Sequence, residues 1–329
     1  MQAQEPGPPF LGLWSRLEDF DADDLHRAID AREVVRARMM RGTLHLLPAA
    51  DFLRFYSAIA PVFSEWMIRY LGPRIEGVDL DDLIAEATAV FAEKESLSAA
   101  ELRNALAERR PDADIRALAA VVRTALPLVR VPDGGRWAYT PRAPFTDAER
   151  WLGRPPRRSR DVAGLVRRYL GAFGPASVAD AEGWLGGGDL APVFERLRPK
   201  LEAFRDERDR ELFDLPEAPR PPGDTPAPVR LLPEFDNLML AHAERSRVID
   251  DDHRKLLTTK NLRVRATVLV DGRVTAFWKA EKKGGRATIA VEPLVKLRAA
   301  ERKAVSAEAE GVARFLEPSA KAHAVRIGS

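Results

Sequence analysis

Two glutamines near the start of the chain, Gln2 and Gln4, flank a single alanine, Ala3. A side-chain amide does not titrate in the useful range, so it cannot act as a strong general base. It can hold a water molecule, because its Oε1 accepts a hydrogen bond and its Nε2 donates one. The alternative is a frayed chain end. The pair therefore indicates water positioning only if other elements hold this segment in place.

Two further groups could do chemistry. Asp236 and Asn237, in the stretch PEFDN with His242 nearby, could orient water or bind a displaced base, although such a pair is also typical of a helix cap. His45, beside Thr43 in GTLHL, lies on a predicted strand. It could contact phosphate, or it could be a packed and satisfied side chain.

Basic side chains and small polar groups could bind a phosphate backbone, and such contacts position a nucleic acid without reading its sequence. Lys260, Arg263 and Arg265 are predicted to alternate along one strand face. Lys282, Lys283 and Arg286 frame a Gly-Gly turn at the tip of a predicted hairpin, where Trp278 could be a wedge or a core residue. The full candidate set is Arg41, Thr43, Arg157, Arg158, Arg160, Lys260, Arg263, Arg265, Lys282, Lys283 and Arg286.

Charge is unevenly distributed, although the net charge is only +2. Residues 76–114 carry 11 acidic and 4 basic side chains, whereas residues 245–286 carry 12 basic and 5 acidic ones. Residues 142–168 carry 8 basic and 3 acidic side chains. Such polarity can steer a polyanion. The alternative is the solvated surface of an arginine-rich protein.

Several classes of protein are disfavoured. The chain has no cysteine, which excludes disulfides and thiolate metal sites and favours a reducing cytoplasm. No apolar run reaches the ~18 residues of a membrane helix. Phosphate-loop, zinc-protease and serine-hydrolase motifs are absent, and the five histidines are scattered. We therefore expect no metal, no cofactor, no membrane partner and a cytoplasmic protein.

The elements that must position these groups follow a recurring order of helices, then strand, turn and strand. This order is typical of a winged helix, in which the third helix can enter a DNA groove. The first unit has a helix at 21–30 and strands around Arg41-Gly42. The second has helices at 78–94, 96–109 and 112–126, then a hairpin that turns at Asp133-Gly134-Gly135. Asp79 is expected to cap the first of these helices, and Ser98 with Glu101 is expected to form a capping box on the second. The third has helices at 159–174, 177–186 and from 189, then strands ending with 210–216.

We therefore predict an α+β protein with three tandem winged helix-turn-helix units and a C-terminal β-rich module; the alternative is a generic α+β fold with incidental hairpins. The C-terminal module is expected to hold a three- or four-stranded meander, a helix at 294–316 and a short last strand. The predicted boundaries are a partial first winged helix at 1–75, a second at 76–145, a basic linker at 146–160, a third winged helix at 161–216, a Pro-rich linker at 217–230 and the C-terminal module at 231–329.

Four separated stretches resemble one known family. MQAQEPGPPFLGLWSRL, MRGTLHLLP, LLPEFDNLMLAHAERSR and VLVDGRVTAFW are similar to the winged-helix proteins of the crosslink-repair DNA glycosylase family. The resemblance implies excision of alkylated purines from duplex DNA, including N7-guanine adducts and interstrand crosslinks. The family's Gln-aliphatic-Gln catalytic signature matches Gln2, Ala3 and Gln4. Family members carry helices before this motif, so the resemblance also implies that these helices are missing from residues 1–75.

The chemistry fits that activity. An N7-alkylated guanine is cationic and already a good leaving group, so positioning of water and electrostatic stabilisation of the sugar suffice. We expect Gln4 to orient the water and Gln2 to orient the sugar or share that water. The prediction is a monofunctional, monomeric DNA glycosylase associated with the nucleoid, its partner alkylated duplex DNA. The alternative is a non-catalytic winged-helix regulator, a class that commonly forms dimers.

Overall fold

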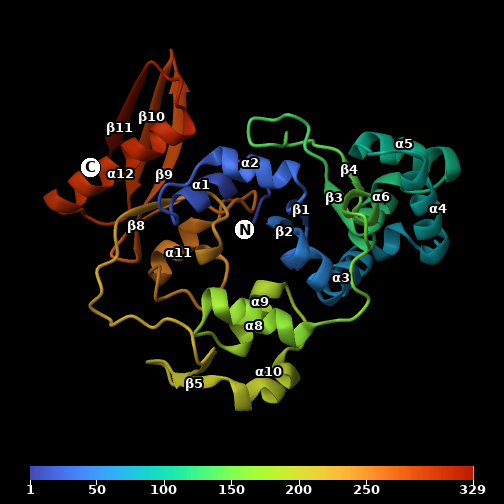
Figure 1. The fold of residues 1–329 in the computed structure, drawn as a ribbon, viewed down its shortest axis with the longest axis horizontal. Coiled ribbons are helices and arrows are strands. Elements are labelled where there is room, and N and C mark those ends of the chain that lie inside the picture. The colour runs from blue at the N-terminus through green and yellow to red at the C-terminus, as the bar shows by residue number, and fades with distance from the viewer. Residues whose placement is uncertain (329) are drawn as a thin grey trace. The chain divides into compact units, whose positions relative to one another are not determined.

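The computed structural model describes residues 1–328, which form a mixed α+β fold (Figure 1). This confirms the α+β class that was predicted. The helices are α1 (Pro8–Trp14), α2 (Ala22–Asp30), α3 (Ala49–Leu71), α4 (Leu80–Glu93), α5 (Ala99–Arg109), α6 (Ile115–Ala125), α7 (Ala148–Leu152), α8 (Val162–Phe173), α9 (Val178–Leu185), α10 (Ala191–Leu197), α11 (Asp251–Leu257) and α12 (Ala299–Leu316). The strands are β1 (Val34–Arg38), β2 (Leu44–Pro48), β3 (Leu128–Arg130), β4 (Phe145–Asp147), β5 (Glu202–Arg205), β6 (Glu211–Asp214), β7 (Arg230–Leu232), β8 (Thr267–Val270), β9 (Arg273–Lys283), β10 (Arg286–Pro293) and β11 (Ala322–Ile327).

The chain divides into two compact units. We call Ala3–Pro6 with Ala22–Pro216 the large unit, and Met1–Gln2, Gly7–Asp21 and Glu217–Ser329 the C-terminal unit. Each has its own hydrophobic core. None of the helices described is long and apolar enough to cross a membrane.

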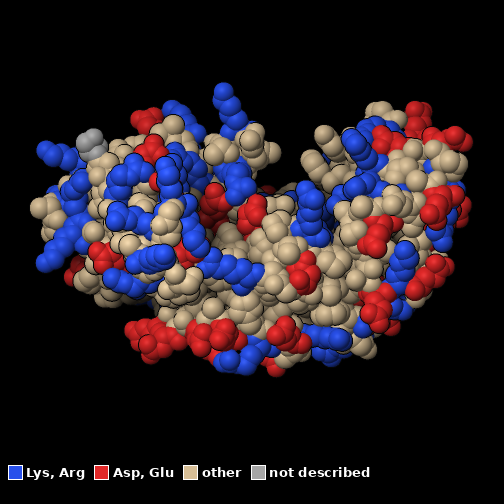
Figure 2. All heavy atoms as spheres, turned by 90° about the horizontal axis from the view of Figure 1, so that it is seen from above, with Lys and Arg blue, Asp and Glu red and all other residues tan. Residues whose placement is uncertain are grey.

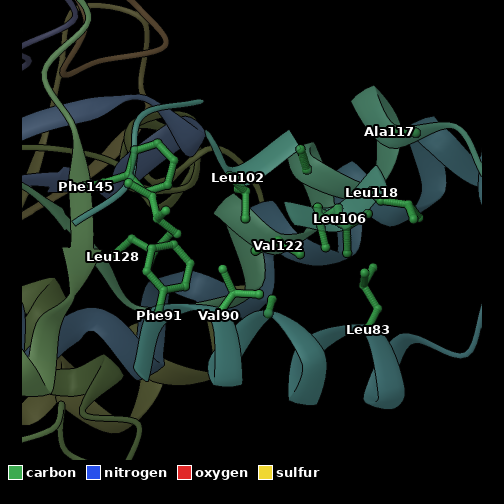
Figure 3. Close-up of a cluster of buried hydrophobic side chains, with 14 of the residues drawn as sticks. Leu83, Val90, Phe91, Leu102, Leu106, Ala117, Leu118, Val122, Leu128 and Phe145 are labelled. Atoms are coloured by element: carbon green, nitrogen blue, oxygen red, sulfur yellow. The ribbon is translucent and has the colours of Figure 1, made fainter. Parts of the chain in front are cut away.

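Helices α4 and α5 of the large unit begin at the caps expected from the sequence, and α6 begins at Asp114, which was not predicted as a cap. Asp79 accepts hydrogen bonds from two backbone N–H groups at the start of α4, and Ser98 and Glu101 form a capping box on α5. The three helices enclose a cluster of buried side chains that also includes Leu128 of β3 and Phe145 of β4 (Figure 3). Helix packing therefore fixes where β3 and β4 lie.

Strands from two predicted units share one sheet, in the order β2-β1-β3-β4. The predicted strands around Arg41-Gly42 are confirmed as β1 and β2, and both turn residues have positive φ. The predicted return strand after Asp133-Gly134-Gly135 is wrong, because β3 pairs with β4 instead. The Asp133 carboxylate accepts hydrogen bonds from the Thr140 N–H and hydroxyl, which closes this loop on itself and removes 136–139 from the sheet.

The order of three helices and two antiparallel strands occurs twice, as α4-α5-α6-β3-β4 and as α8-α9-α10-β5-β6. The segment 146–160, predicted as a linker, contains the end of β4 and all of α7, because the Asp147 side chain caps that helix. Helix α3, which is 23 residues long, was not predicted. The Pro-rich stretch from 217 has no helix or strand before β7 begins at Arg230.

The C-terminal unit is built on a five-stranded sheet in the order β11-β10-β9-β8-β7, with α12 packed against it (Figure 1). Gly284 and Gly285, both at positive φ, form the predicted two-residue turn between β9 and β10. The last strand, β11, pairs parallel to β10. Trp278 is a core residue, since its ring is buried and its Nε1 donates to the Leu232 carbonyl at 2.9 Å.

The predicted strand through Lys260, Arg263 and Arg265 is wrong. Leu262 has a φ of 58°, and its N–H donates to the Thr259 carbonyl at 2.9 Å, so the chain turns at Lys260. Strand β8 begins only at Thr267. These three side chains therefore do not share one strand face.

Candidate active site and nucleic-acid interface

The segment that carries Gln4 is fastened to the large unit along its backbone. The Ala3 N–H donates to the Leu44 carbonyl of β2 at 2.7 Å. Arg36 of β1 donates from Nε to the Ala3 carbonyl at 2.9 Å and from Nη2 to the Gln4 carbonyl at 3.1 Å. A frayed end would have no such partners, so the alternative of an unordered tail does not describe this segment.

The two glutamine side chains differ in exposure. Ala3 is 1% exposed and anchors the segment, Gln2 is 6% exposed, and Gln4 is open to solvent. The Gln4 Oε1 lies 3.5 Å from the Leu44 N–H, at the outer limit of a hydrogen bond. Gln4 therefore has what the positioning of water requires, namely a fixed backbone and an accessible amide.

Arg36 is the buried cation that holds this segment. The residue is 1% exposed, and among residues 1–328 its Nη1 has no hydrogen-bond partner. Its guanidinium lies 5.4 Å from the centre of the Tyr139 ring. Burial lowers the pKa of Arg36, and the nearby Tyr139, Glu5 and Asp133 oppose that shift. Arg36 is a positioning residue, because it fixes the two carbonyls on either side of the Gln4 N–H.

A small pocket lies next to this segment. We call it the arginine pocket; its lining residues are Arg38, Leu44, Arg123, Leu128, Val129, Arg130 and Phe145. Leu44 joins the pocket to the segment that carries Gln4. It lines the pocket, its carbonyl accepts a hydrogen bond from the Ala3 N–H, and its own N–H approaches the Gln4 amide. Arg36 and Arg130 are opposite each other across β1 and β3, and Arg38 lies two residues along β1, on the same face. Helix α6 adds Arg123.

His45 is fully buried and its Nδ1 lies 3.1 Å from the Thr43 carbonyl. Burial holds the pKa of His45 well below its usual range, and the nearby Arg41 adds to the effect, so the ring is neutral. Its Nε2 has no hydrogen-bond partner among the described residues. This placement fits the packed side chain that was the alternative to a phosphate contact.

Asp236 lies within the C-terminal unit with a fully buried side chain. Its Oδ1 accepts hydrogen bonds from the Arg16 guanidinium and the Leu238 N–H, at 2.8 and 2.9 Å, so it caps the short turn that Asn237 begins. His242 is also buried, and its carbonyl accepts from Arg245. The arrangement fits the capping alternative.

The predicted DNA-binding residues fall into three groups. Arg157, Arg158 and Arg160 are exposed, as are Lys260, Lys283 and Arg286. Arg41 and Thr43 donate to backbone carbonyls within the large unit. Arg263, Arg265 and Lys282 pair with Glu234, Glu292 and Glu317 respectively. Figure 2 shows many Lys and Arg side chains over the C-terminal sheet and α12, at the left of that view.

Sequence reasoning missed the arginines of β1, β3 and α6. Arg36 and Arg38 alternate along a correctly predicted strand, which places them on one face and was a usable signal. The contribution of Arg130 could not be found in this way, because the pairing of β1 with β3 joins distant parts of the sequence.

The chain is similar to known proteins along nearly its whole length. The family model described as "DNA glycosylase AlkZ-like" matches residues 1–315. The chain belongs to the AlkZ-like DNA glycosylase family. The family's enzymes hydrolyse N-glycosyl bonds, so the predicted family and enzyme class are confirmed.

Two individual similarities agree with this family. The chain is 25% identical to the interstrand DNA cross-link repair glycosylase of Streptomyces sahachiroi, over 95% of this chain and 87% of that protein. The solved structure of the S. sahachiroi DNA glycosylase AlkZ matches with a TM-score of 0.79 and 22% identity, covering 100% of this chain and 91% of that one. The second similarity supports the fold.

Proposed function

We propose that this AlkZ-like protein hydrolyses the N-glycosidic bond of alkylated purines, N7-guanine adducts among them, in duplex DNA. The observation that supports this most directly is the placement of Gln4. Its exposed amide lies on a backbone held by Arg36 and Leu44, beside a pocket lined by three arginines. The relative named as a cross-link repair glycosylase extends the proposal to interstrand crosslinks.

The proposed mechanism uses neutral groups. N7 alkylation places a positive charge on the base, so the bond to the sugar breaks without protonation of the leaving group. Gln4 accepts a hydrogen bond from the attacking water through Oε1 and fixes its direction, while Gln2 orients the sugar or the same water. The water's remaining proton passes to solvent. The base leaves with the electrons of the glycosidic bond, which neutralise its charge.

The helical segments supply the DNA-binding frame in this proposal. We infer that α4-α5-α6-β3-β4 and α8-α9-α10-β5-β6 are winged helices, and that α2, β1 and β2 belong to a first one. Isolated bridges between Leu97 and Phe145 and between Ala176 and Phe213 support the assignment, because each adds a third short strand beside a hairpin. We propose that the protein acts as a monomer near the nucleoid.

Exposed cations at two other places fit the backbone of a duplex. Lys283 and Arg286 lie beside the Gly284-Gly285 turn, at the tip of a hairpin narrow enough to approach a groove. Arg157, Arg158 and Arg160 are exposed in the segment after α7. Contacts of this kind fix position and orientation on DNA.

The test is release of 7-methylguanine from a duplex under single-turnover conditions. We expect Gln4→Ala to lower the rate about 100-fold, within the range for loss of one positioned group. Gln2→Ala should also lower it. Asn104→Ala removes an exposed amide from α5 of the large unit and is the matched control. Release by Gln4→Ala at the wild-type rate would contradict the role of Gln4, and no release by wild type would contradict the proposed function.

A further inference from the structure

The arginine pocket is unusual because its three cations have no carboxylate partners. Among residues 1–328, no ion pair joins Arg38, Arg123 or Arg130 to an aspartate or glutamate within 4.0 Å. Their hydrogen bonds instead go to backbone carbonyls: Arg38 to Gly42, Arg123 to Ala119 at 3.1 Å, and Arg130 to Ala143. Each guanidinium has five N–H donors, so most of the donors in the pocket are left for another acceptor.

The surroundings make these charges unfavourable in the free protein. Burial lowers the pKa of Arg38 to about 10, and the charge of Arg123 contributes. Burial also lowers the pKa of Arg130 to about 10, and Arg36, Arg123 and Arg38 repel it further. Both side chains remain charged at neutral pH. Asp133, the carboxylate that attracts Arg130, is already bonded to Thr140.

We propose that the arginine pocket binds a phosphodiester group of the DNA strand next to the nucleotide that Gln4 faces. A phosphodiester carries one negative charge and presents two unesterified oxygens, and a pocket of about 20 Å³ lined by Arg38, Arg123 and Arg130 admits one of these oxygens. The floor of the pocket is apolar and rigid, because Leu128 and Phe145 belong to the core of α4–α6 (Figure 3). The inference rests on the proposed function for the identity of that nucleotide.

The pocket also bears on the reaction. The sugar becomes positively charged as the glycosidic bond breaks, and unpaired guanidinium groups nearby would oppose that charge. A bound phosphodiester supplies the opposite charge at the same place. Through Leu44, which lines the pocket and approaches the Gln4 amide, binding also sets the register of the strand over Gln4. The DNA phosphate therefore positions the strand over Gln4 and also balances the positive charge of the guanidinium groups.

The experiment measures affinity on a duplex that cannot be cleaved, carrying 2′-fluoro-7-methyldeoxyguanosine. Neutral methylphosphonates replace the flanking phosphates one at a time. We expect one position to weaken wild-type binding about tenfold, which is typical of a charged hydrogen-bond partner. Arg130→Gln should bind about tenfold more weakly and should be insensitive to that same replacement, because the two changes remove one interaction.

The matched control is Arg205→Gln, which removes an exposed arginine of the same unit that pairs with Asp209. It should keep the wild-type response to every methylphosphonate. Arg130→Lys should recover part of the lost affinity. Arg130 also bonds the Ala143 carbonyl and lies 5.1 Å from the centre of the Phe145 ring, so the Tm of Arg130→Gln is measured only to show that the variant is folded. Full sensitivity of the folded variant to every methylphosphonate overturns the assignment.

Two further measurements test whether the ligand is a free anion and whether the proposed function holds independently of the phosphodiester site. Titration with inorganic phosphate tests a free anion as the ligand, and Arg130-dependent phosphate binding without any methylphosphonate coupling would overturn the DNA assignment. Base release is measured separately on the cleavable duplex. If wild type releases no base while the coupling to Arg130 is present, the proposed function fails and the phosphodiester site stands.

Discussion

Two groups of basic side chains, one in each unit, are accommodated differently. In the C-terminal unit, three of the six cations predicted to bind DNA have carboxylate partners close by. The pairs are Arg263–Glu234, Arg265–Glu292 and Lys282–Glu317, and Arg273 of the same unit pairs with Asp250. In the large unit, Arg36 and the arginines of the pocket bond backbone carbonyls instead. A positive count in the sequence therefore includes cations that are already compensated, whereas Arg38, Arg123 and Arg130 are uncompensated although the charge counts did not select their segments.

The difference has a physical consequence. A surface ion pair contributes at most about 1 kcal/mol to stability, but it occupies the cation and reduces the gain from binding a phosphate. A half-buried arginine without a carboxylate destabilises the free protein, and that cost is recovered when an anion binds. Active and binding sites commonly show this local conflict between stability and function.

The largest expected effect that follows from this comparison is at Arg36. Arg36→Met removes the donors to the Ala3 and Gln4 carbonyls and should lower single-turnover release of 7-methylguanine about 100-fold, since small displacements of a positioned group cost that much. Arg265→Met is the control in the C-terminal unit, where the guanidinium stacks 3.9 Å from the Phe277 ring centre and pairs with Glu292. Equal losses in both variants would remove the distinction between the two classes of arginine.

A second expected effect concerns histidines. The pKa of His45 is depressed by burial, so the unfolded chain binds a proton below its ordinary value of about 6.5 and the folded chain does not. Stability is therefore complete above pH 6.5 and falls as the pH drops. The loss at pH 5 is at most about 2 kcal/mol, the value for a ring that stays neutral in the fold.

Urea unfolding of wild type and His45→Gln at pH 7 and pH 5 measures this loss. The variant should lose up to about 2 kcal/mol less than wild type between the two pH values. His323→Gln alters a histidine of the C-terminal unit, whose Nε2 lies 2.8 Å from the Glu317 carbonyl, and should keep the wild-type difference. An unchanged pH dependence in His45→Gln would show that the ring is protonated within the fold.

Local signals in the sequence were sufficient for much of the fold. The caps at Asp79 and Ser98 and the turn at Gly284-Gly285 are short-range features, and the structure has them where they were predicted. Helix α3 was missed although its start follows β2 directly; Pro61 lies inside it, and a proline normally argues against a helix interior.

The candidate site could be predicted only in part, because the residues that form it come from distant parts of the sequence. The Gln-Ala-Gln stretch is contiguous and could be found by resemblance, but the groups that hold it come from β1 and β2. The pocket beside it needs the long-range pairing of Arg36 with Arg130. The carboxylates that neutralise Arg263 and Arg265 lie 29 and 27 residues away in the sequence and outside the segment 245–286, so the local charge of that segment overstated what is available for DNA.

The smallest expected effect concerns the ion pair between Arg265 and Glu292 in the C-terminal unit. Glu292→Gln removes the partner of Arg265 without changing its shape, and the released guanidinium should raise affinity for an undamaged duplex roughly threefold at physiological salt. The slope of log affinity against log salt should steepen by up to about 0.9, as one more phosphate is neutralised. Glu95→Gln, which removes an exposed carboxylate of the large unit, gives the effect of net charge alone. If both variants gain equally, Arg265 binds no phosphate even when free, and the ion pair is not what keeps it from DNA.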